Sequence, residues 1–206
     1  MKKMNVILNV LMIILFMLAI AFGFKIFSKY YNNHLNENDI EEFISNKYLN
    51  EEKTKDTNNS NLNEDNKEND YIYKGYKVIG IITIEKVNIK YPIIDVNKNK
   101  DEAMSVSVIK FSGKNLNEVG NITIAGHNYY DNTMFAKIHK LDIGDMINIM
   151  DNSGRNIDYQ VFDKYSTSPM DTDCLNSVQK DEKEITLITC SSGNAKRLVI
   201  KAREVI

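Results

Sequence analysis

The segment Glu184-Ile-Thr-Leu-Ile-Thr-Cys190 is followed, after six residues, by Arg197-Leu-Val-Ile-Lys-Ala-Arg203. Both segments are rich in β-branched residues, which favour strands. The intervening residues 191–196 have the length of a hairpin connection. The sequence therefore predicts two antiparallel strands that place Cys190 and Arg197 at the same end of a sheet.

Further strands are predicted outward from this pair, throughout residues 71–206. The helical segments among them are few, at 101–108, 133–141 and 172–180. Many short strands with few helices predict a mainly β fold that closes, or nearly closes, into a barrel. The other predicted strands are 77–84, 89–96, 121–125, 146–150 and 157–165, the last two joined by a turn at Asp151-Asn-Ser-Gly154.

His127 follows the predicted strand 121–125 by two residues, so it also lies at a strand end. If that strand runs parallel to the strand that ends at Cys190, the side chains of Cys190, His127 and Arg197 converge. A partly ionised thiol is a strong nucleophile. An imidazole can protonate a leaving amine, and a guanidinium can stabilise an oxyanion. The three residue types together predict acyl transfer through a thioester.

Each of these residues alone has an ordinary structural explanation. A cysteine at a strand end is commonly a small core residue, a histidine after glycine is commonly a turn residue, and an arginine on an edge strand is commonly a surface cation. The hypothesis of an active site therefore depends on the combination.

The segments around these residues resemble the sortase family. The resemblance covers about residues 79–202, and the motifs have the spacing of that family. The motifs are Thr186-Leu-Ile-Thr-Cys190 followed by Arg197-Leu-Val-Ile200, Ile124-Ala-Gly-His127 with Met134-Phe135 and Leu141-x-x-Gly-Asp145, and Tyr91-Pro-Ile-Ile94.

This resemblance implies a closed eight-stranded sortase β-barrel outside the cell, tethered as a single-pass protein of the cell membrane. It implies that Cys190 attacks the carbonyl before the cut in a cell-wall sorting motif similar to Leu-Pro-x-Thr-Gly. His127 would protonate the leaving amine, Arg197 would stabilise the carbonyl and oxyanion, and Thr189 is expected to contribute to substrate binding. The implied partners are sorting-signal peptides of secreted surface proteins and a peptidoglycan amine, or a pilin lysine. No cofactor is expected.

The subclass stays between class B and class D-like. Typical pilin-polymerising class C members carry an Asp-Pro-aromatic lid and a second, C-terminal membrane helix. Here no proline precedes Pro92, and Ile206 comes directly after the last predicted strand. Two other functions remain open: a thiol hydrolase that resolves the same intermediate with water, and a barrel that binds wall peptides without catalysis.

Residues 1–31 are predicted to form a membrane anchor. Val6–Phe24 contains nineteen residues with Asn9 as its one strongly polar member. As a helix it would span about 28 Å, close to the thickness of a hydrocarbon core. A cleaved signal peptide is the alternative, because Ala19 and Ala21 form a small-residue pattern suited to cleavage. The apolar run continues past this pattern, which favours a retained anchor.

Residues 32–70 are predicted to form an acidic, Asn-rich spacer ahead of the catalytic barrel domain, residues 71–206. From residue 37 to residue 70 there are eleven acidic and four basic side chains. Apolar side chains are too few to offset the entropy of ordering such a segment. Ile40, Phe43 and Ile44 have helical spacing, so a short helix is predicted there, before a flexible tether.

The composition excludes several other classes. With 26 basic and 28 acidic residues, the chain has no nucleic-acid footprint. Two cysteines and three histidines exclude a disulfide-rich scaffold and a four-cysteine zinc site. Cys174 is expected to be an incidental thiol in a polar loop. No spaced acidic loop unites Asp101, Glu102, Glu118 and Asp131, so no metal is expected.

Overall fold

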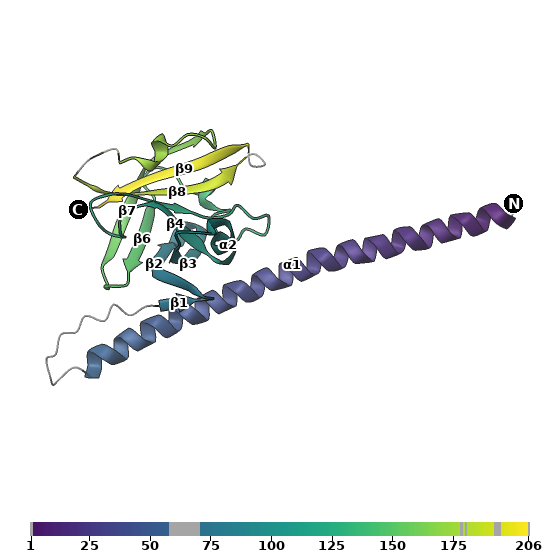
Figure 1. The fold of residues 1–206 in the computed structure, drawn as a ribbon, viewed down its shortest axis with the longest axis horizontal. Coiled ribbons are helices and arrows are strands. Elements are labelled where there is room, and N and C mark those ends of the chain that lie inside the picture. The colour runs from purple at the N-terminus through teal and green to yellow at the C-terminus, as the bar shows by residue number, and fades with distance from the viewer. Residues whose placement is uncertain (1, 58–70, 178, 180, 192–194, 206) are drawn as a thin grey trace. The chain divides into compact units, whose positions relative to one another are not determined.

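An antiparallel pairing between Tyr76–Ile84 (β2) and Met146–Asp151 (β6) closes the sheet into a barrel. The computed structural model describes residues 2–57, 71–177, 179, 181–191 and 195–205. Around the barrel the strand order is β2-β3-β4-β5-β8-β9-β7-β6, and β1 extends the sheet beside β2 (Figure 1). The mainly β, closed eight-stranded fold is therefore confirmed. The remaining strands are Tyr71–Tyr73 (β1), Ile89–Asp95 (β3), Val108–Gly113 (β4), Gly120–Ala125 (β5), Asn156–Thr167 (β7), Lys183–Ser191 (β8) and Lys196–Glu204 (β9).

Two pairings bring three strand ends to one rim of the barrel. Strands β5 and β8 run parallel, with Ala125 opposite Ile188. Strands β8 and β9 run antiparallel and lie side by side in Figure 1, with Cys190 opposite Arg197. The carboxyl ends of β5 and β8 therefore lie next to the start of β9, as the convergence of the predicted site requires.

The short helices fall near their predicted positions. The predicted helix 101–108 is Lys100–Val106 (α2), and it ends early because Val108 begins β4. Strand β4 was missed by the sequence pattern, since Val108 and Ile109 are buried while Phe111 is exposed. The remaining helical elements are the 3₁₀ turns Glu85–Val87 (η1), Ile138–Lys140 (η2) and Asp173–Leu175 (η3).

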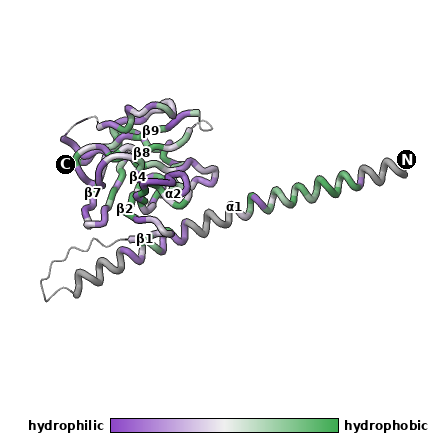
Figure 2. Tube along the Cα trace, in the orientation of Figure 1, coloured by the Kyte–Doolittle hydropathy of each residue, from purple (hydrophilic) through white to green (hydrophobic). Residues whose placement is uncertain are grey.

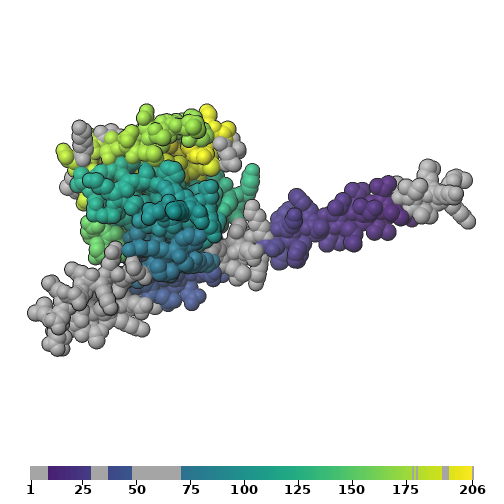
Figure 3. All heavy atoms as spheres, in the orientation of Figure 1, coloured from purple at the N-terminus to yellow at the C-terminus, as the bar shows by residue number. Residues whose placement is uncertain are grey.

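The inward faces of the strands form one apolar core made largely of isoleucine. Ile82, Ile124, Ile149 and Leu187 are completely buried in it. In the space-filling view the earlier strands and the green to yellow C-terminal strands pack as one continuous body (Figure 3). This packing makes the barrel a rigid support for the residues at its rim.

The N-terminal helix, Lys2–Thr57 (α1), contributes to two structural units, residues 1–39 and residues 40–206. In the first unit, Asn9–Ser28 has a mean hydropathy of 2.7 and is not buried. This stretch is the green part of the helix in Figure 2. It is long and apolar enough to cross a membrane by length and composition.

The later part of α1 belongs to the second unit, which the spacer prediction did not anticipate. The helical spacing predicted there is confirmed, but Ile40 and Ile44 are only 1% and 2% exposed and join the barrel core. The Phe43 ring lies 5.0 Å from that of Tyr73, and Lys47 Nζ donates to Asn152 Oδ1 at 2.8 Å. Glu41 and Glu42, which lie between Ile40 and Ile44 in the sequence, are exposed to solvent. The flexible tether was predicted for residues 51–70. Residues 51–57 instead belong to α1, and residues 58–70 lie outside the described residues.

Candidate active site

Cys190 and Arg197 occupy directly paired positions of β8 and β9. The Nη1 atom of Arg197 donates a hydrogen bond to the Sγ atom of Cys190 at 3.3 Å. Paired residues of neighbouring strands present their side chains on the same face. The strand ladder therefore holds the guanidinium against the thiol, and both side chains remain partly exposed.

His127 is anchored to β8 through the glycine before it. The N–H of Gly126 donates to the carbonyl of Ile188 at 3.2 Å, and the hydroxyl of Thr189 donates to the carbonyl of Gly126 at 2.7 Å. A Cβ atom on Gly126 would lie 2.9 Å from the ring of Phe135, so a glycine is required for this close approach. These contacts fix the backbone that presents the imidazole.

The imidazole of His127 is half-buried, and its ring lies 4.8 Å from the ring of Tyr129. Burial lowers the pKa of His127 below its usual value, while the negative charge of Asp101 opposes that shift. A lowered pKa favours the neutral imidazole, which can accept a proton.

One pocket of about 320 Å³ contains Cys190, His127 and Arg197. Helix α2 supplies Asp101 and Met104 to its wall, and the loop between β7 and β8 supplies another part. Most other side chains in the wall are apolar, which suits a peptide with apolar side chains. The further lining residues are Phe111, Ala125, Gly126, Pro169, Asp171, Thr172, Cys174, Leu175 and Ile188.

Two predicted residues have contacts that differ from expectation. Thr189 is only 4% exposed, and its hydroxyl is bonded to Gly126, so it supports the His127 backbone. Cys174 lies in the predicted loop, between β7 and β8, but it is only 3% exposed, belongs to η3 and lines the pocket. Burial raises the pKa of Cys174, which keeps this thiol protonated.

Sequence reasoning missed two residues beside the site. The side-chain amide of Asn128 donates to the carbonyl of Cys190 at 2.8 Å, joining the two strand ends. Its position directly after His127 was the signal that could have indicated it. Asp101 carries no local signal, because it reaches the pocket only through the packing of α2 against β4.

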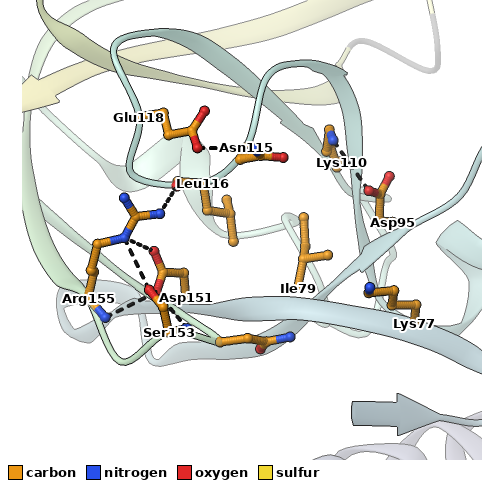
Figure 4. A pocket seen from close by; sticks show the side chains of 11 residues that line it. Lys77, Ile79, Asp95, Lys110, Asn115, Leu116, Glu118, Asp151, Ser153 and Arg155 are labelled. Carbon is orange, nitrogen blue, oxygen red and sulfur yellow. Dashed lines mark hydrogen bonds and ion pairs between the residues drawn. The ribbon is translucent and has the colours of Figure 1, made fainter. Parts of the chain in front are cut away.

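A second, larger pocket of about 420 Å³ has different chemistry (Figure 4). Its lining residues include neither a cysteine nor a histidine, and four of its charged side chains form two ion pairs. Lys110 lies 3.3 Å from Asp95, and Arg155 lies 2.8 Å from Asp151. Within the described part of the chain, no group of three or more His, Cys, Asp or Glu side chains is placed to hold a metal ion.

The pocket contains a thiol beside a guanidinium, together with an imidazole. These three groups can carry out cysteine-dependent acyl transfer. A family model described as the sortase domain matches residues 82–205. This match covers more than half of the chain, so the chain belongs to the sortase family, whose members are cysteine transpeptidases. Curated protein sequences give no significant match.

Solved structures of several sortases are similar to this chain. The Clostridium perfringens sortase D5 transpeptidase is 29% identical, with a TM-score of 0.60, over 83% of this chain and 98% of that one. Sortase A from Corynebacterium diphtheriae is 26% identical, with a TM-score of 0.57, over 64% of this chain and 62% of that one. Sortase C-1 from Actinomyces oris is 26% identical, with a TM-score of 0.56, over 63% and 74%. This chain thus spans less than two thirds of the Corynebacterium chain, and sortases named A, C and D all match.

Proposed function

We propose that this chain is a membrane-anchored transpeptidase that cleaves a sorting motif similar to Leu-Pro-x-Thr-Gly and transfers the surface protein to a peptidoglycan amine. The observation that supports this most directly is the 3.3 Å contact of Arg197 Nη1 with Cys190 Sγ, in a pocket that His127 also lines. Family membership supports the same reaction class.

In the first half-reaction, the Cys190 thiol gives its proton to His127 and its sulfur attacks the peptide carbonyl carbon. A carbon–sulfur bond forms, the peptide carbon–nitrogen bond breaks, and His127 returns the proton to the leaving amine. The product is a thioester on Cys190 and a released peptide amine. The lowered pKa of His127 helps it to release this proton.

In the second half-reaction, the acceptor amine attacks the thioester carbonyl. As the new amide bond forms and the carbon–sulfur bond breaks, His127 takes a proton from that nitrogen. It then passes the proton to the departing sulfur, which restores the Cys190 thiol. Arg197 stabilises the carbonyl oxygen in both steps, since one guanidinium carries five N–H donors and can contact a sulfur and an oxyanion together.

The proposed location follows from the substrates. Secreted surface proteins and peptidoglycan lie outside the membrane, so the barrel must also lie there, with Asn9–Ser28 as the single span. Protease added to intact cells should then degrade the barrel. Complete protection of the barrel in intact cells, with digestion after lysis, would contradict this orientation.

The decisive experiment incubates the full chain in detergent with a Leu-Pro-x-Thr-Gly-like peptide library, with and without an amine acceptor. Transfer of the N-terminal part of a peptide to the amine, through a mass-detectable thioester on Cys190, supports the proposal. Cleavage to the free acid even with saturating amine identifies a thiol hydrolase. A chain that binds peptides and forms no thioester is a binding barrel, and the transpeptidase proposal then fails.

A further inference from the structure

The loop between β7 and β8 carries one wall of the candidate active-site pocket. Its residues Asp171, Thr172, Cys174 and Leu175 line the pocket. Their backbone is shaped by the 3₁₀ turn η3, in which the N–H of Leu175 donates to the carbonyl of Thr172 at 3.0 Å. Residues 173–176 are called the η3 segment below.

Two polar side chains from different strands donate hydrogen bonds to consecutive carbonyl groups of the η3 segment. The side-chain amide of Asn121, on β5, donates to the carbonyl of Leu175 at 2.9 Å. The ammonium of Lys201, on β9, donates to the carbonyl of Asn176 at 2.8 Å. The segment is thus bonded to both strands that flank β8.

Thr186, on β8 between them, completes the cluster. Its hydroxyl lies 2.9 Å from the side-chain oxygen of Asn121 and 3.3 Å from the carbonyl of Cys174. The first contact orients the Asn121 amide toward the η3 segment, and the second brings a third consecutive carbonyl of the segment within hydrogen-bond distance. Thr186 is also directly paired with Lys201 across the β8–β9 ladder.

These three polar side chains are almost completely buried. Asn121 is 8% exposed, Thr186 is 0% exposed and Lys201 is 4% exposed. Burial lowers the pKa of Lys201, although the carboxylate of Glu184 opposes this shift. Burying an ammonium, an amide and a hydroxyl is unfavourable unless each finds a partner. Here the partners are backbone carbonyls of the pocket wall, so the cluster and the segment depend on one another.

We propose that Asn121, Thr186 and Lys201 are positioning residues that hold the η3 segment as the wall of the substrate pocket. The proposal goes beyond the reaction itself, but it rests on the proposed function in one respect, that this pocket receives the sorting peptide. The three side chains act through the η3 segment, not on the reacting atoms. Their loss should therefore weaken peptide binding more than it slows the chemical steps.

The alkylation rate of Cys174 reports how firmly the η3 segment is held, and this measurement needs no substrate. The chain has two cysteines, so Cys190→Ala leaves Cys174 as the single thiol. In that background the full chain, in detergent, is alkylated with a small thiol reagent and followed by mass spectrometry. Thr186→Val should increase the alkylation rate about tenfold, as expected for loss of one hydrogen bond that restrains opening. Lys201→Met should do the same once each rate is divided by the thiolate fraction, because the charge of Lys201 also lowers the pKa of Cys174.

Two matched variants separate this effect from general loosening. Thr186→Ser keeps the hydroxyl and should leave Cys174 protected. Thr83→Val makes the same substitution as Thr186→Val on β2, where the side chain makes no hydrogen bond to the η3 segment in the described structure, and it should leave Cys174 protected. Circular dichroism at the labelling temperature checks that each variant is folded.

Peptide kinetics with Cys190 present then test the link to substrate. Thr186→Val and Lys201→Met should raise KM about tenfold with kcat little changed, and Thr186→Ser should restore KM. Folded variants with unchanged Cys174 alkylation would overturn the proposal. Faster alkylation with unchanged KM would overturn the role in the substrate pocket. If the parent chain processes no peptide, the proposed function fails, whereas the alkylation result still supports or overturns the holding of the η3 segment.

Discussion

Arg197 contacts Cys190 across a directly paired position of the β8–β9 ladder, with Nη1 3.3 Å from Sγ. The ladder continues beyond this pair to Ser191 and Lys196. The relative position of thiol and guanidinium is therefore set by the regular hydrogen bonding of two strands, not by the connection between them. A contact fixed in this way is suited to a site whose geometry must persist through two chemical steps.

Replacing Arg197 tests whether its geometry matters as well as its charge. Arg197→Lys keeps the positive charge but loses the planar fork of donors. We expect a loss of about 10²–10³ in turnover, the usual effect of removing one oxyanion donor. Steady-state cleavage of the peptide, with titration of the Cys190 thiol, measures both contributions.

A matched control is Arg155→Lys, at an arginine of the second pocket that pairs with Asp151. Turnover per folded molecule should not change there. Near-normal turnover of Arg197→Lys would show that charge alone is needed, and near-normal turnover of Arg197→Ala would remove Arg197 from the active site.

The two cysteines should behave oppositely. Cys190→Ala should abolish both cleavage and the thioester, with the same thermal unfolding as the parent chain. Cys174→Ala should retain turnover, because burial raises the pKa of Cys174 and disfavours its reactive thiolate. Mass spectrometry of the acyl-enzyme identifies the modified residue. A thioester on Cys174 would reverse the assignment.

Most strands could be predicted from the sequence because each is a local run of β-branched and apolar residues bounded by turn residues. Residues 185–189 of β8 are all β-branched or leucine, and the Asp151–Gly154 turn marks the β6–β7 hairpin. Strand β4 was missed because its two buried residues are adjacent and its later residues face solvent in alternation. A pattern that short does not distinguish a strand from the end of a helix.

The site residues that lie at strand ends could be predicted from the sequence. The residues that reach the pocket only through tertiary packing could not. The parallel pairing of β5 and β8 brings together Cys190, His127 and Arg197. From the sequence, this convergence could be predicted only on the assumption that the two strands are parallel. The burial of Cys174 depends on the packing of the η3 segment against the barrel, and no local pattern encodes that packing. Likewise, Asp101 reaches the pocket because α2 packs on β4.

Asp101 should influence the proton affinity of His127. Its negative charge raises the pKa of His127 against the lowering effect of burial. Asp101→Asn removes that stabilisation of the imidazolium, so the pKa should fall further below its usual value. His127 must be neutral to take the thiol proton, so the acid limb of kcat/KM, where His127 loses its proton, should then move to lower pH. NMR titration of the ring protons in the Cys190→Ala background measures the shift without the thiol.

Glu102→Gln is the control for this titration, because Glu102 is the neighbouring carboxylate on α2 and lies 3.5 Å from the side chain of Asn99. It should leave the His127 titration in place. A His127 pKa that stays constant or rises in Asp101→Asn would contradict the electrostatic role of Asp101.

The last prediction concerns the part of α1 that packs on the barrel. Ile40 and Ile44 are almost completely buried in the core, so each replacement by alanine should cost about 2–5 kcal/mol of unfolding free energy. Urea unfolding of a fragment of residues 38–206 measures this. Ser45→Ala, on the exposed side of the same helical turn, should change stability by less than about 0.5 kcal/mol.

A fragment that begins at Asp70 loses both isoleucines and the Lys47–Asn152 hydrogen bond. It should therefore unfold at lower urea than the 38–206 fragment and expose the apolar surface that the helix covers, detectable by binding of a hydrophobic dye. Its residual activity should track the folded fraction, because residues 38–69 contribute no side chain to the described wall of the active-site pocket. Equal stability of the two fragments would show that residues 40–47 only rest on the barrel, and that the predicted boundary at residue 70 divides spacer from domain after all.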